Sequence, residues 1–255
     1  MSGKPVVVKL GGTTIAEEGD VLREIVAERR ERPLVVVHGG GKRLSEWLGR
    51  LGVESQWYGG RRVTDEATLE VFLAVISGVI NAELTEALLD LGGEAVGVRG
   101  IDRGMISGPR AAGLDRVISE PVADAALLNT LLEAGYLPVL TPMGLDPDGR
   151  ICNVNADDAA AAVSAALGGE LVLMTDNDGV RGVDGERIVE LTPSAAAQLI
   201  DAGVIAGGMV PKVHSALRAI GPGSHAHRSV IADGRTQRAL QRALHEGAGT
   251  GFRIG

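Results

Sequence analysis

The stretch Val6-Val7-Val8-Lys9-Leu10-Gly11-Gly12-Thr13-Thr14 sets the expectation for the whole fold. A short β-branched run ends in a lysine and two glycines, which predicts a first strand whose tip turns on glycine. Backbone amides beside an ammonium group favour an anion at such a tip, most often phosphate. A plain strand-to-helix turn with an exposed lysine would give the same pattern. The chain otherwise uses arginine, which favours the anion site, because its only lysines are Lys4, Lys9, Lys42 and Lys212.

Composition narrows the classes of protein that fit the chain. Its 255 residues carry a formal net charge of -8, and the sequence pI is near 5.2, so neither a nucleic-acid partner nor an anionic membrane surface is expected. No uninterrupted apolar run is long enough to cross a bilayer, and the N-terminus lacks a secretory pattern. The single cysteine, Cys152, allows no intrachain disulfide and favours the cytoplasm. Cys and His residues do not cluster at metal-ligand spacing, so no protein-held metal is predicted.

Strands and helices alternate along most of the chain. Continuous apolar runs predict buried strands at 6–10, 34–37, 137–141, 171–175 and 229–232. The alternation predicts a three-layer α/β/α sandwich around a mostly parallel sheet, with ligands beyond the carboxyl ends of the strands. The glycine pair Gly168-Gly169 is the expected boundary between two lobes, about 1–168 and 169–255. The segment 99–120 is expected to be irregular or hairpin-like.

A long helix is predicted from about 65 to 91. Thr64 or Asp65 is a suitable N-cap residue, and the apolar residues from Leu69 to Leu91 lie on one helical face. A helix of this length and apolarity is a candidate oligomer interface. A central core helix is the alternative.

Two standard nucleotide-binding motifs, G-x-x-x-x-G-K-[ST] and G-x-G-x-x-G after the first strand, are absent from the sequence. A second lysine, however, occupies an unusual place. Lys212 follows Pro211, a favoured first residue of a helix. A cation in a first helical turn opposes the helix dipole, and a bound anion would offset this cost. A tolerated surface lysine is the alternative.

Several acidic and basic side chains lie near other strand ends, and each of them has both a structural and a functional interpretation. Asn155 can cap a helix that Asp157 and Asp158 open, and one of these carboxylates could instead face inward and hold two lysines. His38 could be a base, but a structural histidine fits better. Arg62 could bind a substrate carboxylate as a bidentate fork or lie on the surface.

Several short motifs share one order and spacing: Lys9-Leu-Gly-Gly12, His38-Gly-Gly-Gly41, Arg62-Val-Thr64, Asn153-Val-Asn-Ala-Asp157, Thr175-Asp176 with Gly179-Val180, and Gly208-Met209 with Lys212. In these motifs the chain resembles the amino acid kinase family over essentially its whole length. It is most similar to members that phosphorylate N-acetyl-L-glutamate and are insensitive to arginine.

The resemblance implies catalytic and nucleotide-binding positions. Lys9 and Lys212 would neutralise the phosphoryl group in transfer, and Asp157 would orient both lysines. ATP would be bound by amides near the first strand tip and by the loop after residue 175, at Gly11, Gly12, Asp176, Gly179, Val180, Arg181 and Met209.

The resemblance also implies an acceptor site and a reaction. Gly40 and Gly41 would contact the acyl amino acid, Arg62 its α-carboxylate and Asn153 its amide or carboxylate end. ATP, with Mg²⁺ held mainly by the nucleotide, would phosphorylate the side-chain carboxylate in a step of arginine biosynthesis. A carboxylate nucleophile needs no general base, which agrees with the lack of an obvious one.

The implied partners leave alternatives open. The long helix near 65–91 would form a homodimer, and the start of the chain close to its first strand suggests the uninhibited, dimeric type. The arginines of segment 99–110 could instead dock a small acidic carrier protein bearing α-aminoadipate or glutamate. A non-catalytic ligand sensor of the same fold is a third possibility, but the presence of both lysines and Asp157 argues against it. A dehydrogenase fits least because the glycine fingerprint is absent.

Overall fold

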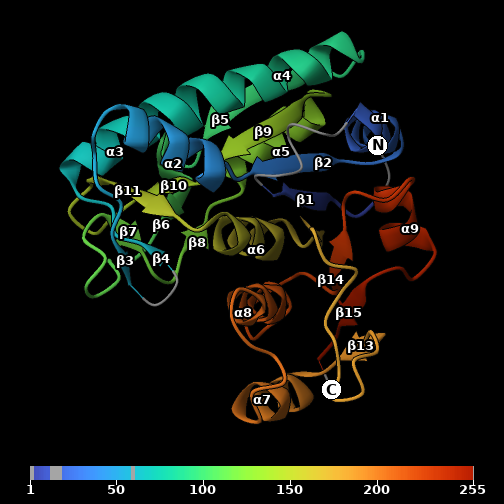
Figure 1. Ribbon diagram of the computed structural model, residues 1–255. Helices are drawn as coiled ribbons and strands as arrows, with labels where there is room; N and C mark the ends of the chain where they lie inside the picture. Colours follow the sequence, from blue (N-terminus) through green and yellow to red (C-terminus); the bar gives the residue numbers. More distant parts are fainter. Residues whose placement is uncertain (1–2, 12–18, 59–60, 255) are drawn as a thin grey trace.

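The computed structural model describes residues 3–11, 19–58 and 61–254 (Figure 1). Its centre is an eight-stranded sheet in the order β13-β15-β14-β12-β1-β2-β9-β5. The strands from β14 to β5 are parallel, whereas β15 and β13 run against them. The strands are β1 (Val6–Leu10), β2 (Leu34–His38), β5 (Ala95–Arg99), β9 (Leu137–Thr141), β12 (Glu170–Thr175), β13 (Glu190–Leu191), β14 (Ser229–Asp233) and β15 (Thr250–Phe252).

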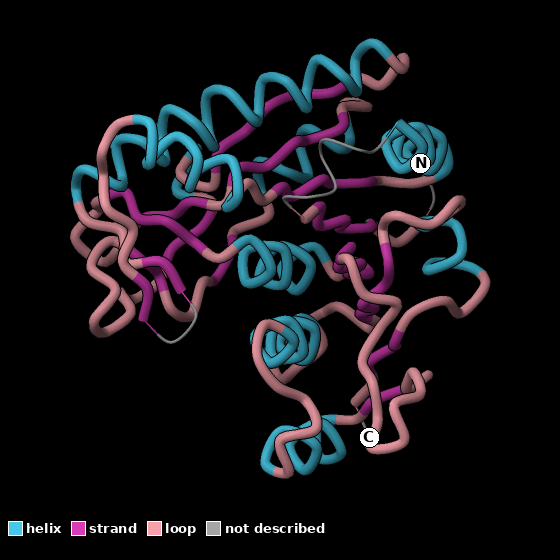
Figure 2. The backbone as a smooth tube through the Cα atoms, viewed as in Figure 1, coloured by secondary structure: helices cyan, strands magenta, loops and turns pink. Residues whose placement is uncertain are grey.

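Helices cover both faces of this sheet, which confirms the predicted three-layer sandwich (Figure 2). Along β1, Val7 packs in the apolar cluster of α5, α6 and α8, whereas Val6 and Val8 pack in the cluster of α1, α4 and α9. Successive side chains of a strand point to opposite faces, so a strand with apolar side chains on both faces needs a helical layer on each side. The helices are α1 (Gly19–Glu31), α2 (Gly41–Arg50), α3 (Glu66–Phe72), α4 (Asn81–Asp90), α5 (Ala126–Glu133), α6 (Ala156–Leu167), α7 (Pro193–Asp201), α8 (Met209–Ala219) and α9 (Ala239–His245).

A smaller sheet and a short hairpin lie under α2 and α3 in Figure 1. The smaller sheet has five strands in the order β7-β11-β10-β6-β8, and β3 pairs with β4 in the hairpin. The segment 99–120, expected to be irregular or hairpin-like, contributes β6 and β7 to the smaller sheet and contains one 3₁₀ turn, Asp102–Gly104. The strands are β3 (Trp57–Tyr58), β4 (Arg61–Arg62), β6 (Ile106–Ser107), β7 (Val117–Ile118), β8 (Val122–Ala123), β10 (Met143–Leu145) and β11 (Ile151–Val154).

The predicted long helix is present and continuous from α3 to α4. Asp65 caps it, because its Oδ1 accepts the backbone N–H of Thr68 at 2.8 Å. Its middle, η1 (Leu73–Ile80), is π-helical, which the apolar pattern did not indicate. Ile76 and Ile80 of this segment pack so closely on Gly40 that a Cβ added there would lie 2.7 and 2.4 Å from their Cδ1 atoms.

The same helix bears on the expectation that no segment could cross a membrane. By length and composition alone, Glu66–Asp90 is long and apolar enough to do so, although its sequence predicted an oligomer interface or a core helix. Half of its most apolar window is buried inside the fold. The core helix of a soluble protein has this same character, so the helix is weak support for a membrane span.

Candidate active site

The carboxyl ends of three neighbouring strands bring polar residues to one edge of the main sheet. β1 lies between β2 and β12, and all three run parallel, so Lys9, His38 and Thr175 share that edge. α6 packs across these strands, and a run of buried alanines, Ala159–Ala162, allows its backbone to lie close to them. Asn155 caps α6 as predicted, with Oδ1 accepting the amides of Asp157 at 2.9 Å and Asp158 at 3.2 Å.

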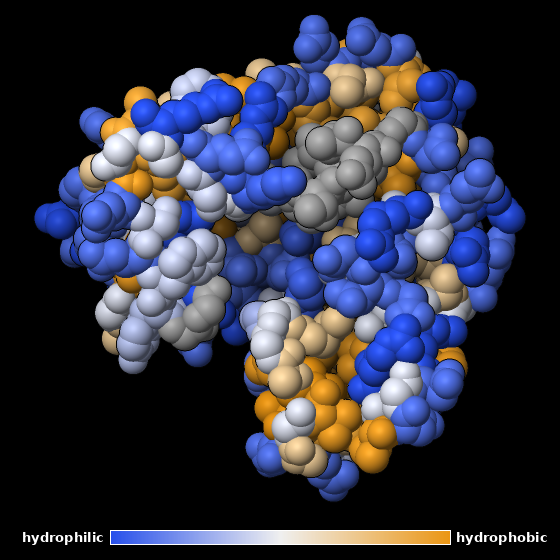
Figure 3. Space-filling model, viewed as in Figure 1, coloured by the Kyte–Doolittle hydropathy of each residue, from blue (hydrophilic) through white to orange (hydrophobic). Residues whose placement is uncertain are grey.

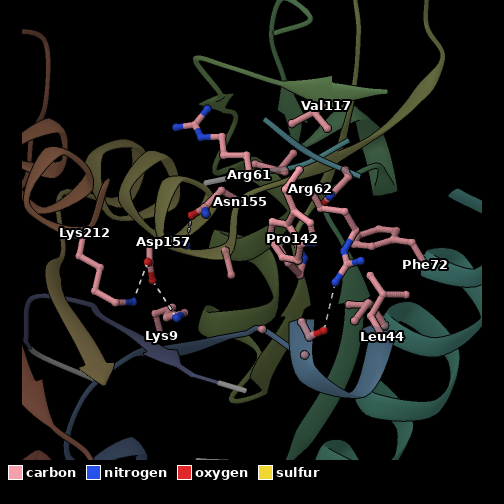
Figure 4. Close-up of a pocket in the computed structure, with 18 residues that line it drawn as sticks. Lys9, Leu44, Arg61, Arg62, Phe72, Val117, Pro142, Asn155, Asp157 and Lys212 are labelled. Carbon is pink, nitrogen blue, oxygen red and sulfur yellow. Dashed lines mark hydrogen bonds and ion pairs between the residues drawn. The ribbon is translucent and has the colours of Figure 1, made fainter. Parts of the chain in front are cut away.

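Asp157 binds both lysines with one carboxylate. Its Oδ1 lies 2.8 Å from Lys9 Nζ, and its Oδ2 lies 3.0 Å from Lys212 Nζ (Figure 4). Asp157 and Lys9 are each only 6% exposed. Of the two interpretations that the sequence left open for the aspartates, the inward carboxylate holds for Asp157. Two ammonium groups from β1 and α8 therefore converge on one point.

The charges of this cluster perturb one another. Burial by itself would raise the pKa of Asp157, but Lys9 and Lys212 outweigh it and lower that pKa to about 2. Burial lowers the pKa of Lys9, Asp157 opposes that effect, and the neighbouring Lys212 lowers it further. Two ammonium groups beside one carboxylate leave an excess of positive charge. The cluster is therefore suited to receive an anion.

Two cavities meet at the lysines. The first has a volume of about 310 Å³ and the second about 290 Å³, and Lys9, Gly41 and Lys212 line both. Figure 3 shows the deep hollow in this part of the surface. Ligands in the two cavities would approach each other across the positive charge. This geometry suits the passage of an anionic group from one ligand to the other.

The first cavity contains all four residues predicted to bind the acceptor, which are Gly40, Gly41, Arg62 and Asn153. Asn153 donates its Nδ2 hydrogen to Thr64 Oγ1 at 3.1 Å, which orients its amide group. Gly40 has a φ of 146°, so both its backbone conformation and its contact with η1 require glycine. The backbone after β2 can therefore approach a ligand closely.

Arg62 is held rigidly at the wall of the first cavity. Its guanidinium group donates to Ser45 Oγ at 2.6 Å and also to Ser55 Oγ, and lies 4.5 Å from the centre of the Trp57 ring. Arg62 is 7% exposed, and burial lowers its pKa. The interpretation of Arg62 as a surface arginine is thus wrong. A fixed guanidinium fork at a cavity wall can bind a carboxylate in two places.

His38 has the structural role that the sequence favoured. It is fully buried, its Nδ1 donates to Gly39 O at 2.9 Å, and Asn81 Nδ2 lies 3.1 Å from its Nε2. Since a carbonyl oxygen only accepts, Nδ1 carries the proton and Nε2 accepts from Asn81. Burial lowers the pKa of His38 to about 4. A neutral imidazole in this network fixes the end of β2.

The predicted nucleotide-binding residues fall in different places. Gly11 and Asp176 line the second cavity, and Gly12 lies outside the described residues. The other four do not line either of the two cavities as described. Val180 is buried, and its N–H donates to Thr250 Oγ1 at 2.8 Å; Arg181 pairs with Asp178 at 3.0 Å. The assignment of Gly179, Val180, Arg181 and Met209 to the nucleotide stays a prediction.

Sequence reasoning missed part of the cavity walls. Leu44, Trp57, Phe72 and Ile76 line the first cavity. Phe72 and Ile76 belong to the apolar stripe of the long helix, and that pattern does not separate a cavity wall from a core contact. Trp57 could have been recognised as a candidate wall residue, because the chain has only 2 tryptophans and this one lies shortly before Arg62, a predicted site residue.

The fold and the site together define the class of protein as an enzyme that transfers phosphoryl groups. A sequence profile of the amino acid kinase family matches residues 4–233. The chain belongs to this family.

Similar proteins cover nearly the whole chain. It is 42% identical over 247 residues to the acetylglutamate kinase of Rubrobacter xylanophilus, a match that spans 96% of this chain and 94% of that protein. It is 38% identical over 257 residues to the acetylglutamate kinase of Dehalococcoides mccartyi, with 97% and 93% covered.

Solved structures share the fold. The smu.665 protein of Streptococcus mutans matches with a TM-score of 0.85 at 24% identity and 99% coverage of both chains. The N-acetylglutamate synthase of Neisseria gonorrhoeae, complexed with coenzyme A and N-acetyl-glutamate, matches with a TM-score of 0.80 at 25% identity, over 99% of this chain and 60% of that one.

Proposed function

We propose that this protein is an acetylglutamate kinase, which transfers the γ-phosphoryl group of ATP to the side-chain carboxylate of N-acetyl-L-glutamate. The products are N-acetyl-L-glutamyl 5-phosphate and ADP, in a step of arginine biosynthesis. The observation that carries the proposal is the position of Lys9 and Lys212, which share Asp157 at the junction of two cavities. Relatives that are called acetylglutamate kinases and match nearly end to end support it.

In the proposed reaction a carboxylate oxygen of the acceptor attacks the γ-phosphorus. The bond from that phosphorus to the β,γ-bridging oxygen breaks, and ADP leaves with the bond electrons. No proton moves in this step, because the attacking carboxylate is already ionised at neutral pH. Lys9 and Lys212 reduce the repulsion between the two anions and stabilise the charge on the phosphoryl oxygens. Asp157 holds both ammonium groups and aims them at one point.

The first cavity suits an acylated amino acid. Arg62 offers a fork for the α-carboxylate, and Asn153 an amide for the acyl group or the second carboxylate. Leu44 and Phe72 form an apolar wall against which an acetyl methyl group can pack. In this assignment residues 1–168 form the acceptor lobe and 169–255 the nucleotide lobe.

The second cavity suits the phosphates of ATP. Gly11, Lys42 and Asp176 line it together with the two lysines. Among the described residues no group of three or more His, Cys, Asp or Glu could by itself hold a metal ion. We therefore assign Mg²⁺ mainly to the phosphate oxygens of the nucleotide, which this ion prefers as ligands together with one or two carboxylates. Bound there, Mg²⁺ would neutralise part of the phosphate charge.

A carrier-bound acceptor is less favoured, because the arginines proposed for docking are already paired. Arg99 lies 2.9 Å from Asp102, Arg103 lies 2.7 Å from Asp124, and Arg110 lies 2.6 Å from Asp146, each measured between nitrogen and carboxylate oxygen. Each arginine is balanced by an aspartate of its own chain. The segment therefore offers an acidic carrier little uncompensated charge.

We also propose a homodimer in the cytoplasm. The outer side of the helix Glu66–Asp90 is the expected interface, since half of its most apolar window is not buried. Sedimentation of the purified protein should give the mass of two chains. Leu89 is 50% exposed, so Leu89→Asp should shift the protein toward the monomer if this face is used.

The experiment that tests the activity traps the acyl phosphate with hydroxylamine. The protein is incubated with Mg-ATP and N-acetylglutamate, glutamate, α-aminoadipate or the carrier-bound acceptor, and hydroxamate and ADP are measured. We expect equal amounts of both products with N-acetylglutamate. Product only with a carrier-bound acceptor would favour the alternative kinase. No product with any acceptor would favour a ligand sensor.

A further inference from the structure

A second carboxylate in the first turn of α6 has partners that the proposed chemistry does not use. Asp158 follows Asp157, and its side chain is 3% exposed. Its Oδ2 lies 3.1 Å from a guanidinium nitrogen of Arg61, and its Oδ1 lies 3.2 Å from one of Arg218. Ser215 Oγ donates to Oδ1 at 2.7 Å. Asp158 thus contacts β4 on one side and α8 on the other.

These partners belong to the elements that carry the proposed binding and catalytic groups. Arg61 precedes Arg62 in β4, and Ser215 and Arg218 lie one and two turns after Lys212 in α8. In Figure 4 Arg62 points toward Leu44, whereas Arg61 points the opposite way. Arg61 lines the acceptor cavity, whereas Asp158 and Arg218 do not, so Asp158 connects a wall of that cavity to α8 from outside it.

The charges of Arg61, Asp158 and Arg218 explain why this contact controls the distance between the β3–β4 hairpin and α8. Arg61 and Arg218 both line a third cavity, of about 530 Å³, together with Gly207 and Gly208. Without a carboxylate between them the two arginines would repel each other across that space, which would push the hairpin away from α8. A buried carboxylate that accepts from both sides reverses this force. Removing one partner of such a buried network costs more than removing an exposed ion pair.

We infer that Asp158 is a positioning residue that clamps the β3–β4 hairpin to α8 and so sets the spacing between the acceptor carboxylate on Arg62 and the phosphoryl group on Lys212. The inference rests on the proposed kinase activity for its kinetic consequence alone. The clamp itself is a property of the free protein and can be measured without substrates.

The kinetic test compares the wild type, Arg218→Gln, Asp158→Asn and the double variant with N-acetylglutamate and Mg-ATP, because Arg218 contacts Asp158 without lining the acceptor cavity. We expect each single change to raise the KM for the acceptor about tenfold, which is the effect of losing one strong contact between coupled side chains. The KM for ATP should stay nearly unchanged. The double variant should be no worse than either single one. Effects that multiply in the double variant, or an unchanged acceptor KM in both single variants, would overturn the inference. Arg218 is partly exposed, so Arg218→Gln keeps the test decisive if Asp158→Asn does not fold.

A second readout follows the hairpin directly. Trp57 lies in β3, and the chain has 2 tryptophans, so Trp47→Phe leaves Trp57 as the only fluorophore of its kind. We expect Asp158→Asn in that background to add fast local motion to the time-resolved anisotropy of Trp57. An unchanged decay would contradict the clamp even if the wild type formed no product, which separates this inference from the proposed function.

The matched control is Asp146→Asn. Asp146 is also a buried carboxylate paired with an arginine, because Arg110 Nε donates to its Oδ2 at 2.6 Å, but it does not line the acceptor cavity. This variant should lower the unfolding temperature while it leaves the acceptor KM and the Trp57 anisotropy unchanged. A rise in the acceptor KM here as large as in Asp158→Asn would attribute the effect to general loss of stability and overturn the clamp.

Discussion

Replacing Lys212 by glutamine tests the proposed charge cluster most directly. The change removes one of two ammonium groups that share Asp157, while Lys9 keeps its own contact with that carboxylate at 2.8 Å. Asp157 therefore retains a partner, and the fold should survive. Burial is the main cause that lowers the pKa of Lys9, and Lys212 lowers it further, so losing Lys212 makes Lys9 more readily protonated. A lower rate could not be explained by neutralisation of Lys9.

The size of the effect follows from the geometry. Two unit charges about 4 Å apart at an effective dielectric constant of about 20 interact by roughly 4 kcal/mol. Part of this also stabilises the bound substrates, because both are anionic before they react. The remainder should match the loss of a preorganised donor, about 10²- to 10³-fold in kcat. We expect the KM for the acceptor to change much less.

The assay measures ADP and hydroxamate at saturating N-acetylglutamate and ATP. Lys4→Gln is the matched control, since Lys4 is exposed and lines neither of the two cavities. This control should keep the wild-type rate. A kcat for Lys212→Gln within about threefold of wild type, measured on a folded protein, would refute the role of the cluster in transition-state stabilisation.

Three further predictions concern Gly40, His38 and Arg62. Gly40→Ala should lower the unfolding temperature by several degrees, because its Cβ would meet Ile76 and Ile80 at 2.7 and 2.4 Å and φ is 146°. In the control Gly41→Ala the Cβ meets nothing within 4 Å, so the unfolding temperature should not fall. Equal effects of the two changes would contradict this packing. The pKa of His38 is lowered from 6.5 to about 4, so the unfolded state alone binds a proton between these values. Stability should therefore fall by about 3 kcal/mol from pH 6.5 to pH 4 in urea unfolding, and the same slope in His38→Asn would exclude His38 as its source. Arg62→Lys should raise the acceptor KM about 10- to 100-fold because an ammonium group cannot form the bidentate contact, with a smaller change in kcat; an unchanged KM would remove Arg62 from the acceptor site.

Much of this architecture could be predicted because it depends on local patterns. Continuous apolar runs such as Val6–Val8 indicated a parallel sheet covered on both faces, and the described layers agree. Thr64 or Asp65 and, separately, Asn155 were predicted as helix caps from their residue types. Asp65 accepts one backbone amide and Asn155 accepts two. Lys212 was noticeable because its charge opposes the helix dipole.

Features that depend on three-dimensional packing were not accessible in this way. The π-helical turns of η1 arise where Ile76 and Ile80 pack on Gly40, and the apolar stripe is compatible with an ordinary α-helix there. Asp158 was expected either to open α6 beside the cap Asn155 or to be the carboxylate that holds the lysines. Nothing local indicates that Arg61 and Arg218 meet at its carboxylate. Long-range ion pairs require the tertiary fold before they can be recognised.

The place of β1 in the sheet has a consequence for synthesis on the ribosome. β1 pairs with β2 soon after both have emerged, but its other neighbour, β12, is Glu170–Thr175. Until that strand leaves the exit tunnel, the nascent chain exposes an apolar edge at what will become the middle of the sheet. The growing polypeptide should bind chaperones throughout this interval, and fragments released before residue 175 should aggregate.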